Sequence, residues 1–256
     1  MKKVKTKLIA ELGTLHMSSF QVQLDAVKAS FDAGADLVKL QLINPESAWW
    51  ASSLQKKRYQ EIDWSPFKWE DFFTQCQKEF KDRVFASLFD TSFLSLDYLM
   101  PIWKLGWKAN STPDLIERVF ESGVKPIFWS MNGTEYWRNG LNAQPVEGFD
   151  RESSVARRLE AHSLEDRTKR FYVQTVYPIP DELKIIPKFG TNYHGLSYHS
   201  NDLPFIGAAI LAGAQYVEVH CYAKGASGPD TTFALSMKDL KNLSKLRDKL
   251  CQSIPV

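Results

Sequence analysis

The alternation of short apolar runs with amphipathic stretches constrains the fold of this chain more than any other feature. Runs rich in Val, Ile and Phe recur along the sequence, and stretches with helical periodicity separate them. This alternation is typical of parallel strands that are each followed by a crossover helix. The length of 256 residues suits one such domain. We therefore predict a single α/β domain, a (β/α)8 TIM barrel, over residues 1–256.

Eight strands and several of the intervening helices can be delimited. The expected strands are residues 7–13, 36–41, 84–89, 107–110, 126–131, 171–176, 194–199 and 215–221. Helices are expected at 18–32, 69–80, 114–122, 203–212 and 236–250. Ser18 and Asp114 are suitable helix-start residues, and Gly34, Gly123 and Gly213 are expected to end helices before the next strand.

Composition excludes several classes of protein. The 32 basic and 30 acidic residues form no long run of one sign, so we expect no nucleic-acid or membrane partner. No apolar stretch is long enough to span a bilayer, and the first apolar run reads as a strand rather than a signal peptide. The three cysteines lack CxxC spacing, which favours a reducing, cytoplasmic location and no cysteine metal site. Cys76 is expected in a helix core.

Two connections are longer than a barrel needs. Residues 42–65 carry three tryptophans, and residues 132–170 are highly charged. Because both follow strands, we expect both over the face that carries the active site. Each connection is either a surface elaboration with packed aromatic side chains or a lid or subunit contact. The two interpretations remain equally open.

Polar residues two apart near a strand end point to the same place, and this sequence repeats that pattern. The pairs are Lys39 with Gln41, Lys108 with Asn110, Ser197 with His199, and Glu218 with His220. Barrel strands are normally apolar, and buried charges are costly unless they are paired or face a ligand. A binding site explains these residues better than packing does.

The types of these residues indicate what the site would hold. Lys39 and Lys108 suit a phosphate or carboxylate, although either alone could extend to water. His199 and His220 on adjacent strands suit one divalent ion, although each could equally be a hydrogen-bonded core histidine. We expect both amines and both imidazoles in one cavity. His16 could join them.

Other candidates carry less weight. His162 is interpreted as solvated and His194 carries little signal. The segment 225–230 is glycine-rich, which permits close approach of the backbone to a ligand. It lacks the spacing of a nucleotide-binding loop.

Six fragments in order resemble the sialic acid synthases, which condense phosphoenolpyruvate with an N-acyl sugar. The fragments are residues 9–16 (IAELGTLH), 34–41 (GADLVKLQ), 177–180 (YPIP), 195–199 (GLSYH), 217–220 (VEVH) and 228–230 (GPD). The resemblance covers the barrel domain. It implies a transferase in which the enol carbon of phosphoenolpyruvate attacks a metal-polarised aldehyde, and water addition and loss of phosphate follow.

The following roles come from the resemblance, except that Asn110 comes from the strand-end pattern and Asp114 from its place next to Pro113. Catalytic roles fall on Lys39, Lys108, Asp114 and Tyr177. Substrate binding falls on Glu11, Gln41, Asn110, Ser111, Ser130, Ser197 and Asp230. His199 and His220 fall on the family's ligands for Mn²⁺ or Mg²⁺.

Four departures from the family pattern bear on activity. Pro113 stands where the family has a catalytic Glu, and Asp114 is either its substitute or a helix-start acid. Residues 87–90 read SLFD instead of Ser-Thr-Pro, and Tyr198 replaces an Asp. The chain ends at Val256, so we expect no C-terminal antifreeze-like domain, and a homodimer is expected from the family alone.

The sequence therefore predicts a divergent synthase that condenses phosphoenolpyruvate with a sugar or another aldehyde. Pro113 keeps open a member of the family that binds its ligand without catalysis. A metal-dependent lyase or isomerase on the same barrel also remains open, because fold alone does not fix function.

Overall fold

The computed structural model describes residues 5–15, 19–48, 51–61, 65–124, 126–132, 158, 161–162, 165–174, 179–181 and 184–253. The strands pair in the order β1 to β9, and β1 pairs in addition with β8, which closes the sheet. The predicted (β/α)8 barrel is therefore confirmed. The chain forms two compact units, unit 1 with residues 1–40 and 171–256 and unit 2 with residues 41–170.

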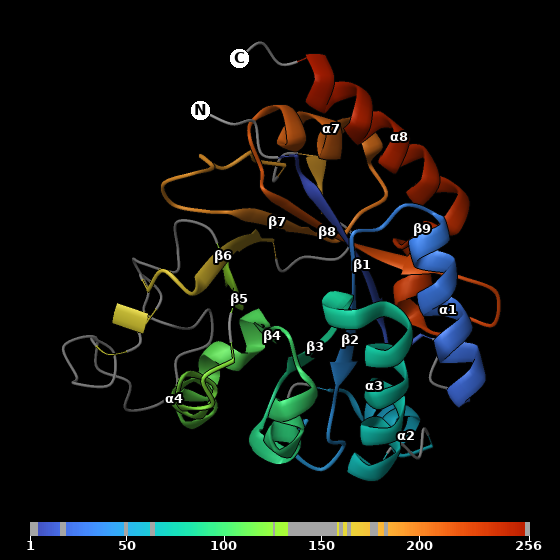
Figure 1. The fold of residues 1–256 in the computed structure, drawn as a ribbon, viewed down its shortest axis with the longest axis vertical. Coiled ribbons are helices and arrows are strands. Elements are labelled where there is room, and N and C mark those ends of the chain that lie inside the picture. Colours follow the sequence, from blue (N-terminus) through green and yellow to red (C-terminus); the bar gives the residue numbers. More distant parts are fainter. Residues whose placement is uncertain are drawn as a thin grey trace. The chain divides into compact units, whose positions relative to one another are not determined.

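The strands of unit 1 are parallel, and β1 lies between β8 and β2 (Figure 1). They are β1 (Lys7–Gly13), β2 (Leu37–Leu42), β6 (Thr168–Val173), β7 (Gly195–Tyr198), β8 (Tyr216–Tyr222) and β9 (Leu235–Ser236), with β2 ending and β6 beginning in unit 2. Glu11 of β1 stands opposite Lys39 of β2 and His220 of β8. Residues in register share a face of the sheet, so these three side chains point the same way. The two-residue strand β9, which pairs with β8, was not predicted.

Three helices cover the strands of unit 1, namely α1 (Phe20–Asp32), α7 (Leu203–Leu211) and α8 (Met237–Ser253). The side chains of Ser19 and Asp202 cap α1 and α7 by accepting hydrogen bonds from the first turn of each helix. The helices α7 and α8 lie side by side (Figure 1). A short 3₁₀ helix, η5 (Pro229–Thr232), follows β8.

Arg247 ties α8 to the starts of β1 and β2. Its guanidinium Nη1 lies 2.5 Å from the Asp36 carboxylate and donates to the carbonyl of Thr6 at 3.2 Å. Asp36 in turn accepts a hydrogen bond from the Leu8 amide at 2.8 Å. The buried arginine therefore fixes the N-terminal ends of two adjacent strands.

Unit 2 contains β3 (Val84–Leu88), β4 (Trp103–Leu105) and β5 (Ile127–Asn132), with β4 between the other two. Its helices are α2 (Ser53–Glu61), α3 (Pro66–Phe80) and α4 (Pro113–Glu121), joined by the 3₁₀ helices η1 (Lys81–Arg83), η2 (Thr91–Leu99) and η3 (Trp107–Ser111). The connection 42–65 thus holds a helix, α2, whose side chains are all at least partly exposed. Cys76 is buried in α3 as predicted.

The fourth strand was predicted at the wrong place. Residues 107–110 belong to η3, and β4 lies at Trp103–Leu105 instead. The amide of Ala109 bonds to the carbonyl of Gly106, and that of Thr112 bonds to Ala109, so the backbone turns directly after Gly106. None of residues 107–111 is β-branched, which leaves little preference for an extended strand.

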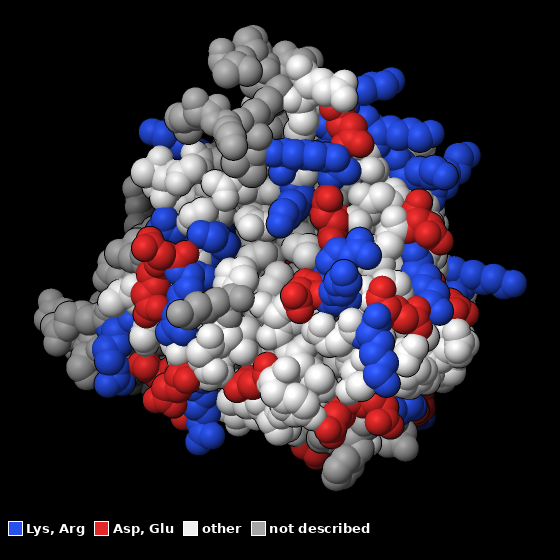
Figure 2. All heavy atoms as spheres, viewed as in Figure 1, with Lys and Arg blue, Asp and Glu red and all other residues white. Residues whose placement is uncertain are grey.

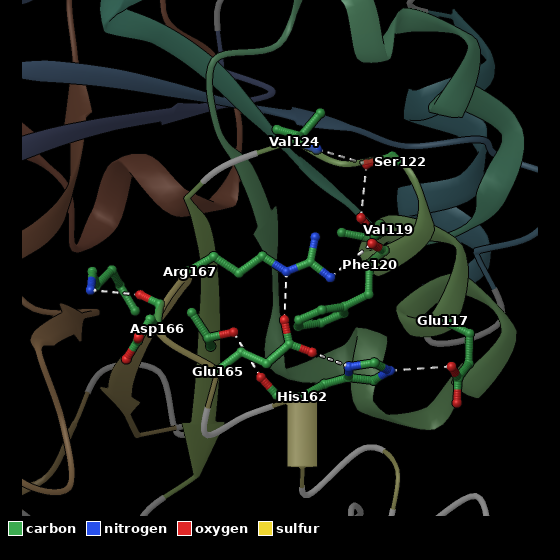
Figure 3. Close-up of polar contacts among 11 residues, drawn as sticks. Glu117, Val119, Phe120, Ser122, Val124, His162, Glu165, Asp166 and Arg167 are labelled. Carbon is green, nitrogen blue, oxygen red and sulfur yellow. Dashed lines mark hydrogen bonds and ion pairs between the residues drawn. The ribbon is translucent and has the colours of Figure 1, made fainter.

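His162 is packed rather than solvated, contrary to the sequence interpretation (Figure 3). Its ring stacks on Phe120 of α4 at 4.2 Å, and its nitrogens contact Glu165 at 2.5 Å and Glu117 at 3.3 Å. Arg167 donates to Glu165 at 2.6 Å and to the carbonyl of Phe120 at 2.8 Å. These contacts join the segment before β6 to α4 within unit 2.

The charged side chains are interspersed on the face drawn in Figure 2, in keeping with a formal net charge of +2. Among the residues that the structure describes, none of the helices combines the length and apolar character needed to cross a bilayer.

Candidate functional site

Four buried polar residues occupy four consecutive strands of unit 1. Ser197 lies on β7, Glu218 on β8, Glu11 on β1 and Lys39 on β2. Their exposed fractions are 3%, 3%, 0% and 5%, respectively. Polar and charged groups are costly to bury without partners, so all four side chains need partners inside the sheet.

The four side chains pair with one another. The Lys39 ammonium pairs with the Glu11 carboxylate and donates to Glu218 Oε1 at 3.1 Å. Ser197 Oγ donates to the same Glu218 oxygen at 2.7 Å. We call this set of four residues the polar chain.

Gly13 completes the environment of Glu11. Its amide donates to Glu11 Oε1 at 2.6 Å, and the register between β1 and β2 shifts between these two residues. Gly13 has a φ of 54°, a left-handed conformation that glycine adopts without a steric penalty. The irregularity turns the Gly13 amide back toward the carboxylate.

Charge in the polar chain is unbalanced in favour of anions. Burial holds the pKa of Lys39 below its ordinary value, although the charge of Glu218 and its hydrogen bond act to raise it. Two carboxylates share this one ammonium. Such a cluster electrostatically favours a further cation nearby.

Two imidazoles lie beside the polar chain. The ring centres of His199 and His220 are 5.1 Å apart, and His199 Nδ1 contacts the carbonyl of Gln174 at 3.2 Å. Burial, the neighbouring His199 and the charge of Lys39 hold the pKa of His220 well below its ordinary value. His220 is therefore neutral at neutral pH, which is the form that binds a metal.

Asp230 is the acid nearest to this pair for which the structure gives a distance. Its carboxylate lies 4.0 Å from His220 Nδ1, a buried atom without a hydrogen-bond partner. The contact is too long for a hydrogen bond, so it leaves His220 Nδ1 unsatisfied. Groups of three or more His, Cys, Asp or Glu side chains that could hold a metal are absent from the described residues.

The other predicted site residues that the structure describes lie in unit 2. Gln41 follows Lys39 on β2, whereas Lys108, Asn110 and Ser111 lie on η3. The Asn110 side chain accepts from Trp129 Nε1 at 2.5 Å and donates to the carbonyl of Ser130 at 3.3 Å. Both ends of this amide are thus engaged in joining η3 to β5, which is a structural role.

Lys104 is a buried lysine that the sequence interpretation missed. It lies in the middle of β4 with 1% of its surface exposed, opposite Ser87 of β3 and Phe128 of β5. Lys108 is only half-buried and lies 6.0 Å from the Trp107 ring centre. The buried amine of the fourth strand is therefore that of Lys104. A lysine between the apolar residues Trp103 and Leu105 is the signal that could have revealed it.

Asp114 has the surroundings of a helix-start acid. Its side chain is 69% exposed in the first turn of α4, where it pairs with Arg118 at 3.2 Å. Pro113 occupies the first turn as well, a position in which its missing N–H carries no cost. This geometry gives no support to a catalytic role for Asp114.

Two of the other departures have local structural explanations. Asp90 caps η2 by accepting from the Ser92 amide at 2.7 Å and also contacts the Ser47 hydroxyl. Tyr198 is buried and stacks on Phe205 of α7, with ring centres 4.8 Å apart. Successive side chains of a strand point to opposite faces, so Tyr198 points away from Ser197 and lies outside the polar chain.

Two candidates, His16 and Tyr177, lie outside the described residues. Of the four groups expected to meet in one cavity, Lys39, His199 and His220 are together in unit 1. The fourth-strand amine belongs to unit 2.

A separate cavity of about 810 Å³ lies in unit 2, lined by Gly123, Pro126, Glu165, Asp166 and Arg167. It adjoins the residues that precede β5 and β6, and none of the predicted site residues lines it.

The fold and the polar chain define a (β/α)8 barrel protein with a buried charged site on four of its strands. Residues 170–254 match the model of the NeuB family, a segment that includes Ser197, His199, Glu218 and His220. The resemblance to the sialic acid synthases is thereby confirmed over this part of the chain. No sequence of a curated protein matches the chain.

Solved structures share the fold at low sequence identity. An N-acetylneuraminic acid (sialic acid) synthetase from Leptospira borgpetersenii serovar Hardjo-bovis is 17% identical with a TM-score of 0.73, covering 96% of this chain and 84% of that one. The spore coat polysaccharide biosynthesis protein spsE of Bacillus subtilis is 20% identical with a TM-score of 0.71, covering 96% and 68%. A truncated 3-deoxy-D-arabino-heptulosonate 7-phosphate synthase from Thermotoga maritima is 11% identical with a TM-score of 0.65, covering 97% and 87%.

Proposed function

We propose that this protein is a synthase that condenses phosphoenolpyruvate with a sugar or a related aldehyde. The observation that carries the proposal is the Lys39 ammonium, held between two carboxylates beside a pair of buried imidazoles. The match of residues 170–254 to the NeuB family supports the same reaction class. Lys39 supplies positive charge toward an anionic substrate.

The paired imidazoles fit a divalent metal, which we propose to be Mn²⁺ or Mg²⁺ held by His199 and His220. His220 is neutral, and its buried Nδ1 atom has no hydrogen-bond partner, which a further ligand would satisfy. The contact of His199 Nδ1 with the Gln174 carbonyl orients that ring, as partners of metal-bound histidines commonly do. When bound, the cation supplies Lewis acidity toward the aldehyde oxygen.

The residues of the chain supply binding and orientation. The polar chain alone carries a net negative charge, so we propose that a cation on the adjacent imidazoles offsets it and lets the buried Lys39 ammonium hold a substrate carboxylate or phosphate. Asp230 borders the same site near His220 and is proposed to bind the acceptor.

The reaction is tested by incubating the protein with Mn²⁺, phosphoenolpyruvate and a panel of aldehydes while phosphate release is measured. We expect release with at least one aldehyde and a loss of at least a hundredfold in Lys39→Met. Lys245→Met, an exposed substitution on α8, is the matched control and retains the wild-type rate. Absence of phosphate release with every aldehyde would refute the synthase.

Metal binding is tested separately by Mn²⁺ titration followed by electron paramagnetic resonance. His199→Gln and His220→Gln each weaken binding at least tenfold, because each removes one of two protein ligands. His162→Gln, which lies in unit 2, serves as the control. Equal Mn²⁺ affinity in all four proteins contradicts the assignment.

A second candidate function is ligand binding without catalysis. Pro113 favours it, since a pyrrolidine in the place of the family's Glu transfers no proton. Tight binding of phosphoenolpyruvate in a calorimeter, with no phosphate released, distinguishes this candidate. A lyase or isomerase would instead yield products without condensation.

A further inference from the structure

The polar chain contains one residue to which the proposed reaction gives no role, Glu218. It is 3% exposed on β8, and one of its oxygens, Oε1, receives two hydrogen bonds. The donors are Lys39 at 3.1 Å and Ser197 at 2.7 Å. A buried carboxylate with two donors on one oxygen has little freedom to rotate.

The strand order explains why this arrangement needs Glu218. Ser197 stands directly opposite Glu218 in the register of β7 and β8. Lys39 stands opposite Glu11, on β2, so its side chain reaches past β1 to meet β8. With Glu11 as its one partner, the Lys39 ammonium would lie over β1. The carboxylate of Glu218 on β8 moves the ammonium further along the sheet, toward β7.

We propose that Glu218 is a positioning residue that sets the location of the Lys39 ammonium. Ser197 fixes the Glu218 carboxylate, and the carboxylate fixes the ammonium between β8 and β1. The ammonium then donates to Glu218 and forms an ion pair with Glu11, and the proposal leaves a further N–H for an anionic ligand. This inference rests on the proposed function for the identity of that ligand.

The position of the ammonium can be tested without any substrate. In the full-length protein labelled with ¹⁵N-lysine, a buried ammonium held by two carboxylates exchanges its hydrogens slowly enough to give a resolved ¹H–¹⁵N signal. Lys39→Met assigns the signal. Glu218→Gln is expected to accelerate hydrogen exchange at least tenfold, and Ser197→Ala several-fold, while Glu117→Gln in unit 2 leaves the signal unchanged.

Two results of the ammonium spectrum overturn the proposal. One is a Lys39 signal with the same shift and exchange rate in Glu218→Gln as in the wild type. If Glu218→Gln does not fold, the second result is a Lys39 signal that is unchanged in Ser197→Ala, which also overturns the proposal. Neither measurement depends on turnover.

Steady-state kinetics separate positioning from a general structural role. Glu218→Gln is expected to raise KM for phosphoenolpyruvate at least tenfold, with KM for the aldehyde and the Mn²⁺ affinity within twofold of wild type. A uniform loss in all three quantities indicates a structural residue and overturns the inference. If the wild type neither binds phosphoenolpyruvate nor releases phosphate, the proposed function fails, and the ammonium spectrum still decides the role of Glu218.

Discussion

Gly195 offers a sharp test of the packing inside unit 1. It lies on β7 between β6 and β8 and precedes Ser197 of the polar chain by two residues. A Cβ atom built on Gly195 would lie 2.8 and 2.9 Å from two ring carbons of Phe171 and 3.0 Å from Cβ of Tyr216. These separations are well below the ordinary contact of about 3.5–4.0 Å between carbon atoms. Gly195→Ala therefore forces either the Phe171 ring or a strand to move.

The cost of this movement is about 1–3 kcal/mol, the usual penalty for overpacking a core. For a domain of this size each kcal/mol lowers Tm by about 2–4 °C, so we expect a decrease of about 2–12 °C. Urea unfolding followed by circular dichroism measures the change directly. The midpoint should fall with an unchanged slope, since the fold itself is kept.

Gly207→Ala is the matched control. Its Cβ on α7 would lie 3.5 Å from Leu246 and 3.6 Å from Leu250, which is ordinary contact. Alanine in place of a helical glycine stabilises by about 0.5–1 kcal/mol, so this variant should unfold at higher urea. The double variant Gly195→Ala, Phe171→Leu should recover part of the loss. Wild-type stability in Gly195→Ala would refute the placement of the Phe171 ring over Gly195.

Two further variants probe charged residues. Lys39→Met leaves two buried carboxylates without their shared cation, so the free energy of unfolding should fall by about 3–5 kcal/mol. A urea midpoint equal to that of wild type would contradict this pairing. Arg247→Met removes the buried partner of Asp36 and should cost about 2–4 kcal/mol, to be checked by thermal unfolding at equal ionic strength.

The strands were predictable where apolar residues alone determine burial. The predicted range 7–13 coincides with β1, and the second strand begins only one residue late. The fourth strand failed because it has only three residues and holds a lysine at its centre. Lys108 and Asn110 have the two-residue spacing expected at a strand end, but they lie in the 3₁₀ helix η3.

The residues of the candidate site were predictable where they follow the alternation of side chains along a strand. Lys39, Ser197, His199 and His220 follow from the two-residue period of a strand, and the structure brings them together in unit 1. The contact of His199 with a backbone carbonyl has no sequence signal, because every residue carries that group. Which oxygen of a carboxylate receives two donors also depends on strand register, which a local pattern does not contain.

The polar chain lies on strands and hardly involves loops, and this has an evolutionary consequence. Each of its four side chains is anchored by the hydrogen-bonded ladder of the sheet, so insertions in the connecting segments leave their mutual distances unaltered. In the proposed synthase, preference for one acceptor over another can then change through loop mutations while the polar chain is kept. A lineage built in this way can acquire a new acceptor while its inherited electrostatics stay fixed.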